Sequence, residues 1–114
     1  MDHFTVAALH EEREQRGKPY HEFLRVPAMS AGMYELAVGA ADLQQPHSED
    51  ELYYVVAGQG QIRVGEEDQA VAAGSLVLVA AGMVHRFHSI TEALSVLVVF
   101  APAEYSQRHS EQPR

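Results

Sequence analysis

Apolar and polar positions follow a helical spacing at the start of the chain. Between residues 5 and 16, Val6, Leu9 and Arg13 fall three or four positions apart, and charged side chains fill much of the rest. Gly17 stands where a helix C-terminal cap belongs, and Lys18-Pro19 interrupts the pattern. The pattern therefore predicts one short helix, and we assign residues 1–18 to an N-terminal helical segment.

Beyond Pro19 the pattern changes to short runs rich in Val, Leu and Tyr, separated by turns that contain Gly or Pro. Gly58-Gln59-Gly60 is expected to form a tight hairpin between two of these runs. The expected strands are Phe23–Val26, Met33–Val38, Glu51–Ala57, Gln61–Val64, Gln69–Val71, Ser75–Val79, His85–Ser89 and Leu94–Phe100. No helical pattern interrupts them, which excludes parallel βαβ units and predicts an all-β antiparallel sandwich or barrel over residues 19–102. Residues 103–114 form a polar C-terminal tail, expected to be mobile or to lie on a partner subunit.

Composition narrows the class of protein. The 114 residues suit one domain, and eight basic against sixteen acidic residues give a net charge of −8. This balance argues against nucleic acid and anionic membrane surfaces as partners. The chain has no cysteine, so disulfides, thiolate nucleophiles and cysteine-based zinc sites are excluded. The start of the sequence has no pattern of a secretory signal, and its apolar stretches are too short to span a membrane, so we expect a cytoplasmic protein.

Candidate chemistry is concentrated in one extended stretch and one later strand. Alternate residues of an extended chain share a face, so Gln45, His47 and Glu51 can point the same way. His85 opens a later strand. Buried histidines and carboxylates are costly unless they are paired or bind a metal. Two imidazoles and one carboxylate are a common ligand set for non-haem iron and related divalent metals.

The spacing of these residues follows a first motif, G-x5-H-x-H-x3,4-E-x6-G. Gly39, His47, Glu51 and Gly58 occupy its positions, and Gln45 stands where the first histidine belongs.

A second motif, G-x5-P-x-G-x2-H-x3-N, is matched at Gly74, Gly82 and His85, with Ala80 in place of the proline and Ser89 in place of the asparagine. Together the two motifs resemble those of the cupin superfamily. The resemblance implies a small antiparallel β-barrel, also described as a double-stranded β-helix or jelly roll, with a metal at its centre.

The resemblance also implies a ligand set of His47, Glu51 and His85 around one divalent ion, which could be Fe, Mn, Ni, Zn or Cu. Gln45 is a hypothetical fourth ligand through its amide oxygen, and the alternative is that it leaves this position to water or substrate. Glu49 shares the parity of Glu51 and competes with it. We favour Glu51 as the ligand because of its spacing to Gly58, and Glu49 is left as a candidate base.

The resulting functional hypothesis is a small metalloenzyme acting on a small oxygenated metabolite, with dioxygenase, isomerase or lyase chemistry open. The alternatives are a cupin that binds a small ligand without turnover and one whose metal is structural. Val-rich strands such as Leu94–Phe100 would leave apolar edges exposed in a lone barrel, so we expect a homodimer.

Overall fold

The computed structural model describes residues 1–43 and 46–106. It begins with one helix, α1 (Val6–Arg16), whose first turn is capped by the Thr5 hydroxyl, an acceptor for the backbone N–H of Ala8 at 3.2 Å. Gly17 closes the helix in the left-handed conformation, with φ of 68°. The helix expected from the sequence is therefore confirmed. The strands that follow are β1 (Tyr20–Val26), β2 (Met29–Leu36), β3 (Asp50–Val64), β4 (Glu67–Ala72), β5 (Leu76–Val79) and β6 (His85–Ala101).

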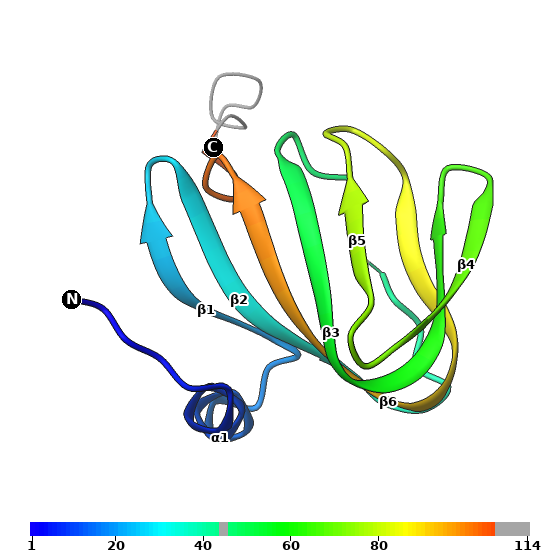
Figure 1. Ribbon diagram of the computed structural model, residues 1–114, viewed down its shortest axis with the longest axis horizontal. Helices are drawn as coiled ribbons and strands as arrows, with labels where there is room; N and C mark the ends of the chain where they lie inside the picture. Colours follow the sequence, from blue (N-terminus) through cyan, green and yellow to red (C-terminus); the bar gives the residue numbers. More distant parts are fainter. Residues whose placement is uncertain (44–45, 107–114) are drawn as a thin grey trace.

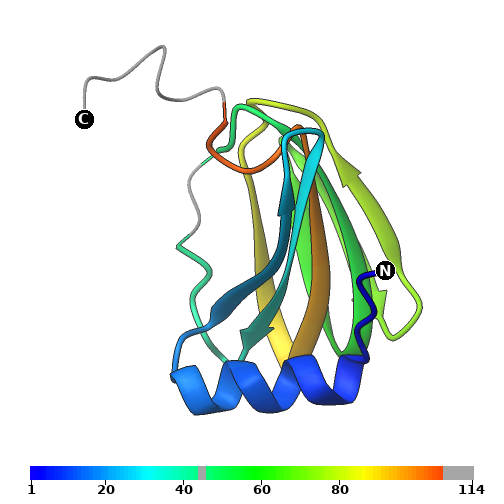
Figure 2. The ribbon, with the colours of Figure 1, turned by 90° about the vertical axis from the view of Figure 1, so that its left-hand side faces the viewer.

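These strands form one antiparallel sheet that curls into two facing layers (Figures 1 and 2). The strand order is β1-β2-β6-β3-β4, and β5 pairs with the first half of β3. Strands β3 and β6 pair along almost their whole lengths and bend together, so each contributes to both layers. The expected all-β jelly roll with a short N-terminal helix is confirmed.

The stretch Gly58-Gln59-Gly60 does not form the hairpin expected from the sequence. Strand β3 runs through it without reversing, with irregular register against β6 between Val55 and Gln61. Gly58 has a φ of 101°, and a side chain there would meet the backbone carbonyl of Ala93. The glycines thus permit a bend and a close approach between two long strands. Strand β6 likewise joins two runs that were expected to be separate strands.

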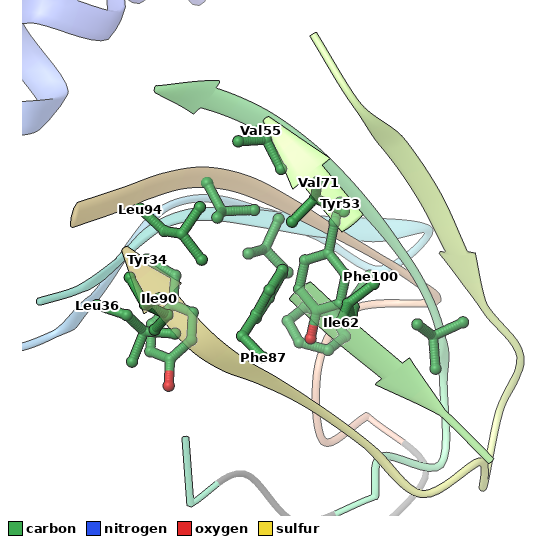
Figure 3. Close-up of a cluster of buried hydrophobic side chains, with 13 residues drawn as sticks. Tyr34, Leu36, Tyr53, Val55, Ile62, Val71, Phe87, Ile90, Leu94 and Phe100 are labelled. Atoms are coloured by element: carbon green, nitrogen blue, oxygen red, sulfur yellow. The ribbon is translucent and has the colours of Figure 1, made fainter. Parts of the chain in front are cut away.

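The core lies between the two layers and combines aliphatic and aromatic side chains from both (Figure 3). The rings of Tyr53 and Phe87 meet edge to face, with centroids 5.0 Å apart. Along the first half of β3, exposed and buried residues alternate strictly, as expected for a strand with one face against the core. The buried cluster is Tyr34, Leu36, Tyr53, Val55, Ile62, Val71, Val79, Phe87, Ile90, Leu94, Val96, Val98 and Phe100.

The chain after β6 folds back across the β1–β2 turn, at the end of the sheet opposite α1 (Figure 2). Ala103 and Glu104 are buried there. The backbone N–H of Ala103 donates to the carbonyl of Pro27 at 3.4 Å, and that of Glu104 donates to the Ser30 hydroxyl at 2.8 Å. The first residues of the expected polar tail therefore pack on their own barrel, and residues 107–114 lie outside the described residues. Within the described part of the chain, no helix has the length and hydropathy needed to cross a membrane.

Candidate metal centre

Three elements bring two histidines and one carboxylate together inside the barrel. His47 lies just before β3, Glu51 is the second residue of β3, and His85 is the first residue of β6. The distance from His47 Nδ1 to Glu51 Oε1 is 3.5 Å, and that from His85 Nε2 to the same oxygen is 3.2 Å. One nitrogen or oxygen from each residue lies within 4.8 Å of the others, which is compact enough for all three to bind one ion.

The atoms that face the centre of this cluster are buried but poorly paired. His47 Nδ1, both carboxylate oxygens of Glu51 and His85 Nε2 have no hydrogen-bond partner of good geometry among the described residues. The side chains of Glu51 and His85 are each only 1% exposed. Leaving such atoms unsatisfied costs free energy, and most buried polar groups in native proteins are paired. Imidazole nitrogens and a carboxylate are suitable ligands for a divalent metal, so the cluster fits such an ion.

The outward-facing nitrogen of each histidine does have a partner. Nδ1 of His85 lies 2.8 Å from the carbonyl oxygen of Met83, and Nε2 of His47 lies 2.9 Å from a carboxylate oxygen of Glu104. A carbonyl oxygen can only accept, so Nδ1 of His85 carries a proton, and in the neutral imidazole the lone pair is then on Nε2. Partners of this kind orient metal-binding histidines and fix their tautomer.

Without a metal, the three groups strongly perturb one another's protonation. Burial alone would lower the pKa of His47, but contacts with Glu104 and Glu51 outweigh burial and raise it to about 9. Burial would raise the pKa of Glu51, but His47 and His85 lower it to about 2. Burial also acts to lower the pKa of His85, and Glu51 and the Met83 carbonyl raise it above its ordinary value. The metal-free cluster therefore holds protons where cations would bind.

The competing carboxylate, Glu49, lies outside the cluster. It is 1% exposed, and its oxygens accept hydrogen bonds from the Ser48 hydroxyl at 2.6 Å and from the backbone N–H of Tyr105 at 3.0 Å. Glu49 thus connects the entry to β3 with the segment after β6. Gln45, the hypothetical fourth ligand, lies outside the described residues.

Glu104 is a site residue that the sequence analysis did not identify. It follows β6 by three positions, in a stretch that was treated as a polar tail, and neither motif includes it. The return of the chain over the β1–β2 turn brings it to His47.

Aromatic rings line the interior around the cluster. The ring of His47 lies 4.7 Å from that of Phe100, and the ring of His85 lies 6.0 Å from that of Tyr53. The hydroxyl of Tyr20 is buried without a hydrogen-bond partner among the described residues. Burial raises the pKa of this hydroxyl above its usual range, and the charges of Glu104, Glu22 and Glu51 raise it further. The hydroxyl therefore remains protonated and can donate a hydrogen bond.

An open depression of about 420 Å³ lies beside His47. His47 forms part of its wall, together with Pro46, Ser48, Ala81 and Gly82. Glu51 and His85 are not among the residues that line it.

A known protein family matches this chain. The family model described as a cupin domain matches residues 32–111, more than half of the chain. The chain belongs to the cupin family. It is 48% identical over 104 residues to an uncharacterized protein of Streptomyces coelicolor, covering 91% of this cupin and 99% of that protein.

A second similarity is to an enzyme. The cupin is 32% identical over 88 residues to acireductone dioxygenase 3 of Arabidopsis thaliana, covering 73% of this chain but only 44% of the plant protein. Solved structures share the fold. The protein TT1209 from Thermus thermophilus gives a TM-score of 0.72 at 24% identity, covering 90% of this chain and 99% of that one. KdgF from Halomonas sp. gives 0.67 at 19% identity, covering 73% and 76%.

Proposed function

We propose that this cupin is a metal-dependent enzyme of the dioxygenase type, acting on a small oxygen-bearing metabolite. His47, Glu51 and His85 would hold one divalent ion, and iron is favoured because two histidines and one carboxylate are the ligand set of many non-haem iron oxygenases. The observation that carries the proposal is the close approach of one ligand atom from each of these three buried residues, all within 4.8 Å of one another. A bound cation would satisfy all of them.

Within this proposal, the chain's own residues bind, orient and shield. The ion would supply Lewis-acid or redox chemistry when bound. The ring of Phe100 packs against His47, and the ring of Tyr53 packs against His85. The unpartnered hydroxyl of Tyr20 is available to donate a hydrogen bond to an oxygen of the substrate. Gln45 and Glu49 are kept as the candidate fourth ligand and candidate base.

The similarity to acireductone dioxygenase 3 favours oxygenase chemistry over isomerase or lyase chemistry. The aligned region spans less than half of the plant enzyme, so the proposal extends to a reaction class and not to that enzyme's substrate.

The low exposure of the ligand side chains favours a second candidate function. Glu51 and His85 are almost completely buried, as expected for a metal that is closed to exogenous ligands. In that case the ion would stabilise the barrel, and any ligand binding in the depression would occur without turnover.

Metal loading followed by azide binding tests the proposal. The protein would be prepared without a histidine tag, loaded with ferrous iron, and analysed for metal content. We expect about one iron per chain in the wild type and in His88→Ala, a control on a histidine that contacts Asp68 outside the cluster. His85→Ala should lose the iron.

After oxidation to ferric iron, azide should change the absorption spectrum if a coordination position is open, and oxygen uptake should be metal-dependent with a panel of small enediols and hydroxyketones. Bound iron without an azide response would favour the structural metal. Failure of the wild type to bind any divalent ion would contradict both functions.

We further propose that two copies associate through the outer face of β3 and β5. Leu52 pairs with Leu78 and Tyr54 pairs with Leu76 across these strands, and all four side chains are 40–68% exposed. Each chain carries a net charge of −8, so two copies are expected to associate through a surface without charged groups. These four uncharged side chains form such a surface, and a two-fold axis through them would bury the same residues in both copies.

A further inference from the structure

We propose that Glu104 is a positioning residue that makes Nδ1 of His47 the metal-binding nitrogen. This inference rests on the proposed metal site and concerns how that site is built. It assigns a role to the segment after β6, which neither sequence motif includes.

The contact between Glu104 and His47 fixes where one proton lies on the His47 ring. A carboxylate oxygen of Glu104 lies 2.9 Å from Nε2 of His47. An ionised carboxylate only accepts hydrogen bonds, so Nε2 must carry the proton that is shared with it. In the neutral imidazole the lone pair then resides on Nδ1, and Nδ1 is the nitrogen that lies 3.5 Å from Glu51 Oε1.

His85 is oriented in a different way from His47. Its Nδ1 donates to the Met83 carbonyl, so its Nε2 faces Glu51 at 3.2 Å. The two histidines therefore present different ring nitrogens to the same carboxylate. A backbone carbonyl fixes one tautomer and a side-chain carboxylate fixes the other, and both kinds of partner raise the basicity of a metal-binding imidazole.

Glu104 lies outside the group of candidate metal ligands. The group of side chains whose ligand atoms lie within 4.8 Å of one another contains His47, Glu51 and His85, and within the described residues it does not extend to Glu104. Glu104 contacts the far side of the His47 ring. It therefore acts through His47.

The segment that carries Glu104 is held in place by several contacts. The backbone of Glu104 is held on both sides, by donation to the Ser30 hydroxyl at 2.8 Å and by acceptance from the Arg25 guanidinium at 2.6 Å. The next residue, Tyr105, donates its N–H to Glu49 and lies with its ring 5.7 Å from that of His47. These contacts hold the backbone that carries the Glu104 side chain, and a rigid support of this kind helps to orient a ligand.

The test uses zinc, a diamagnetic probe, with nitrogen-15 NMR of the histidine rings. Spectra of zinc-loaded wild type, with His47 assigned through His47→Gln, should show Nε2 protonated and Nδ1 bound to metal. Competition with a chelator should show about 10–100-fold weaker zinc affinity in Glu104→Ala, the usual effect of removing such a partner. Glu104→Gln, whose amide oxygen still accepts from Nε2, should recover part of the affinity.

Glu66→Ala is the matched control. It removes one negative charge at the exposed β3–β4 turn, so it should bind zinc like the wild type. Equal zinc affinity in Glu104→Ala and wild type, or coordination of His47 through Nε2 in the wild type, would overturn the inference and leave the metal site intact. If Glu104→Ala fails to fold, the wild-type spectrum and Glu104→Gln still decide. A wild type that binds no zinc would overturn both the inference and the proposed function.

Discussion

Raising the pH from about 6 to about 10 should destabilise the metal-free protein through His47. The pKa of His47 is about 9 in the folded state, against an ordinary value of 6.5. A raised pKa means that the folded state binds the proton more tightly than the unfolded state. The stabilisation is therefore fully present below pH 6.5 and is lost as the pH rises through 9.

The size of the effect follows from the same two values. Their difference, 9 − 6.5 = 2.5, corresponds to about 3 kcal/mol at ~1.4 kcal/mol per pH unit. The side chain is only 8% exposed, so solvent screens its contacts with Glu51 and Glu104 weakly. Because Glu51 has its lowered pKa through the same contact, its contribution is not added.

Urea unfolding in the presence of a chelator measures this effect. The chain has no tryptophan, so circular dichroism is the suitable signal. Other groups titrate over the same range, and His47→Gln subtracts them. The difference in unfolding free energy between wild type and His47→Gln should shrink by about 3 kcal/mol between the two pH values. A difference that stays constant or grows with pH would refute the reasoning.

The metal-loaded protein should respond with the opposite sign. A metal binds neutral imidazole, so the proton on Nδ1 of His47 must leave before the ion can enter. Zinc affinity should therefore rise with pH over the interval in which the metal-free protein loses stability. Chelator competition at several pH values checks this, and zinc affinity that is flat or falls would contradict a shared site for proton and metal.

Three further perturbations test the fold and assembly. Gly58→Ala should cost about 3 kcal/mol in urea unfolding, because alanine would be strained at φ 101° and would clash with backbone. Asp42→Ala should cost about 3 kcal/mol, since the Tyr34 hydroxyl and the Phe87 N–H, each 2.8 Å from its carboxylate, lose their acceptor. Leu78→Lys should halve the mass measured by light scattering without lowering the unfolding midpoint of the isolated chain. Wild-type-like values in any of these measurements would contradict the corresponding contact.

Local sequence rules predicted much of this structure because they act over a few residues. Thr5 and Gly17 have the chemistry of helix caps, and both cap α1. Alternation predicted the inward face of β3, where Glu51, Tyr53 and Val55 are all buried. The three residues of the cluster lie together, as the resemblance to the cupin motifs implied.

The bend of β3 could not be predicted by the same rules. Gly58-Gln59-Gly60 has the composition of a hairpin, and glycine favours both a turn and a bend. What decides between them is the approach of Ala93 from β6, more than thirty residues away in the chain. A strand long enough to cross both layers needs such a bend, so the hairpin prediction was wrong because the tertiary contact that decides the conformation is not visible in the local sequence.

Glu104 illustrates a different limit, and one with consequences for function. In sequence it is one acid in a polar stretch, and its burial depends on anchors from β1 and β2 to its backbone and from Glu49 to the next residue. None of these anchors has a fixed spacing to Glu104, so no motif could include it. If the NMR tautomers agree with the geometry, the orientation of a metal ligand at the start of β3 depends on a segment that is not part of the barrel. Substitutions at Arg25 or Ser30, which contact the backbone of that segment, should then weaken metal binding without touching any ligand.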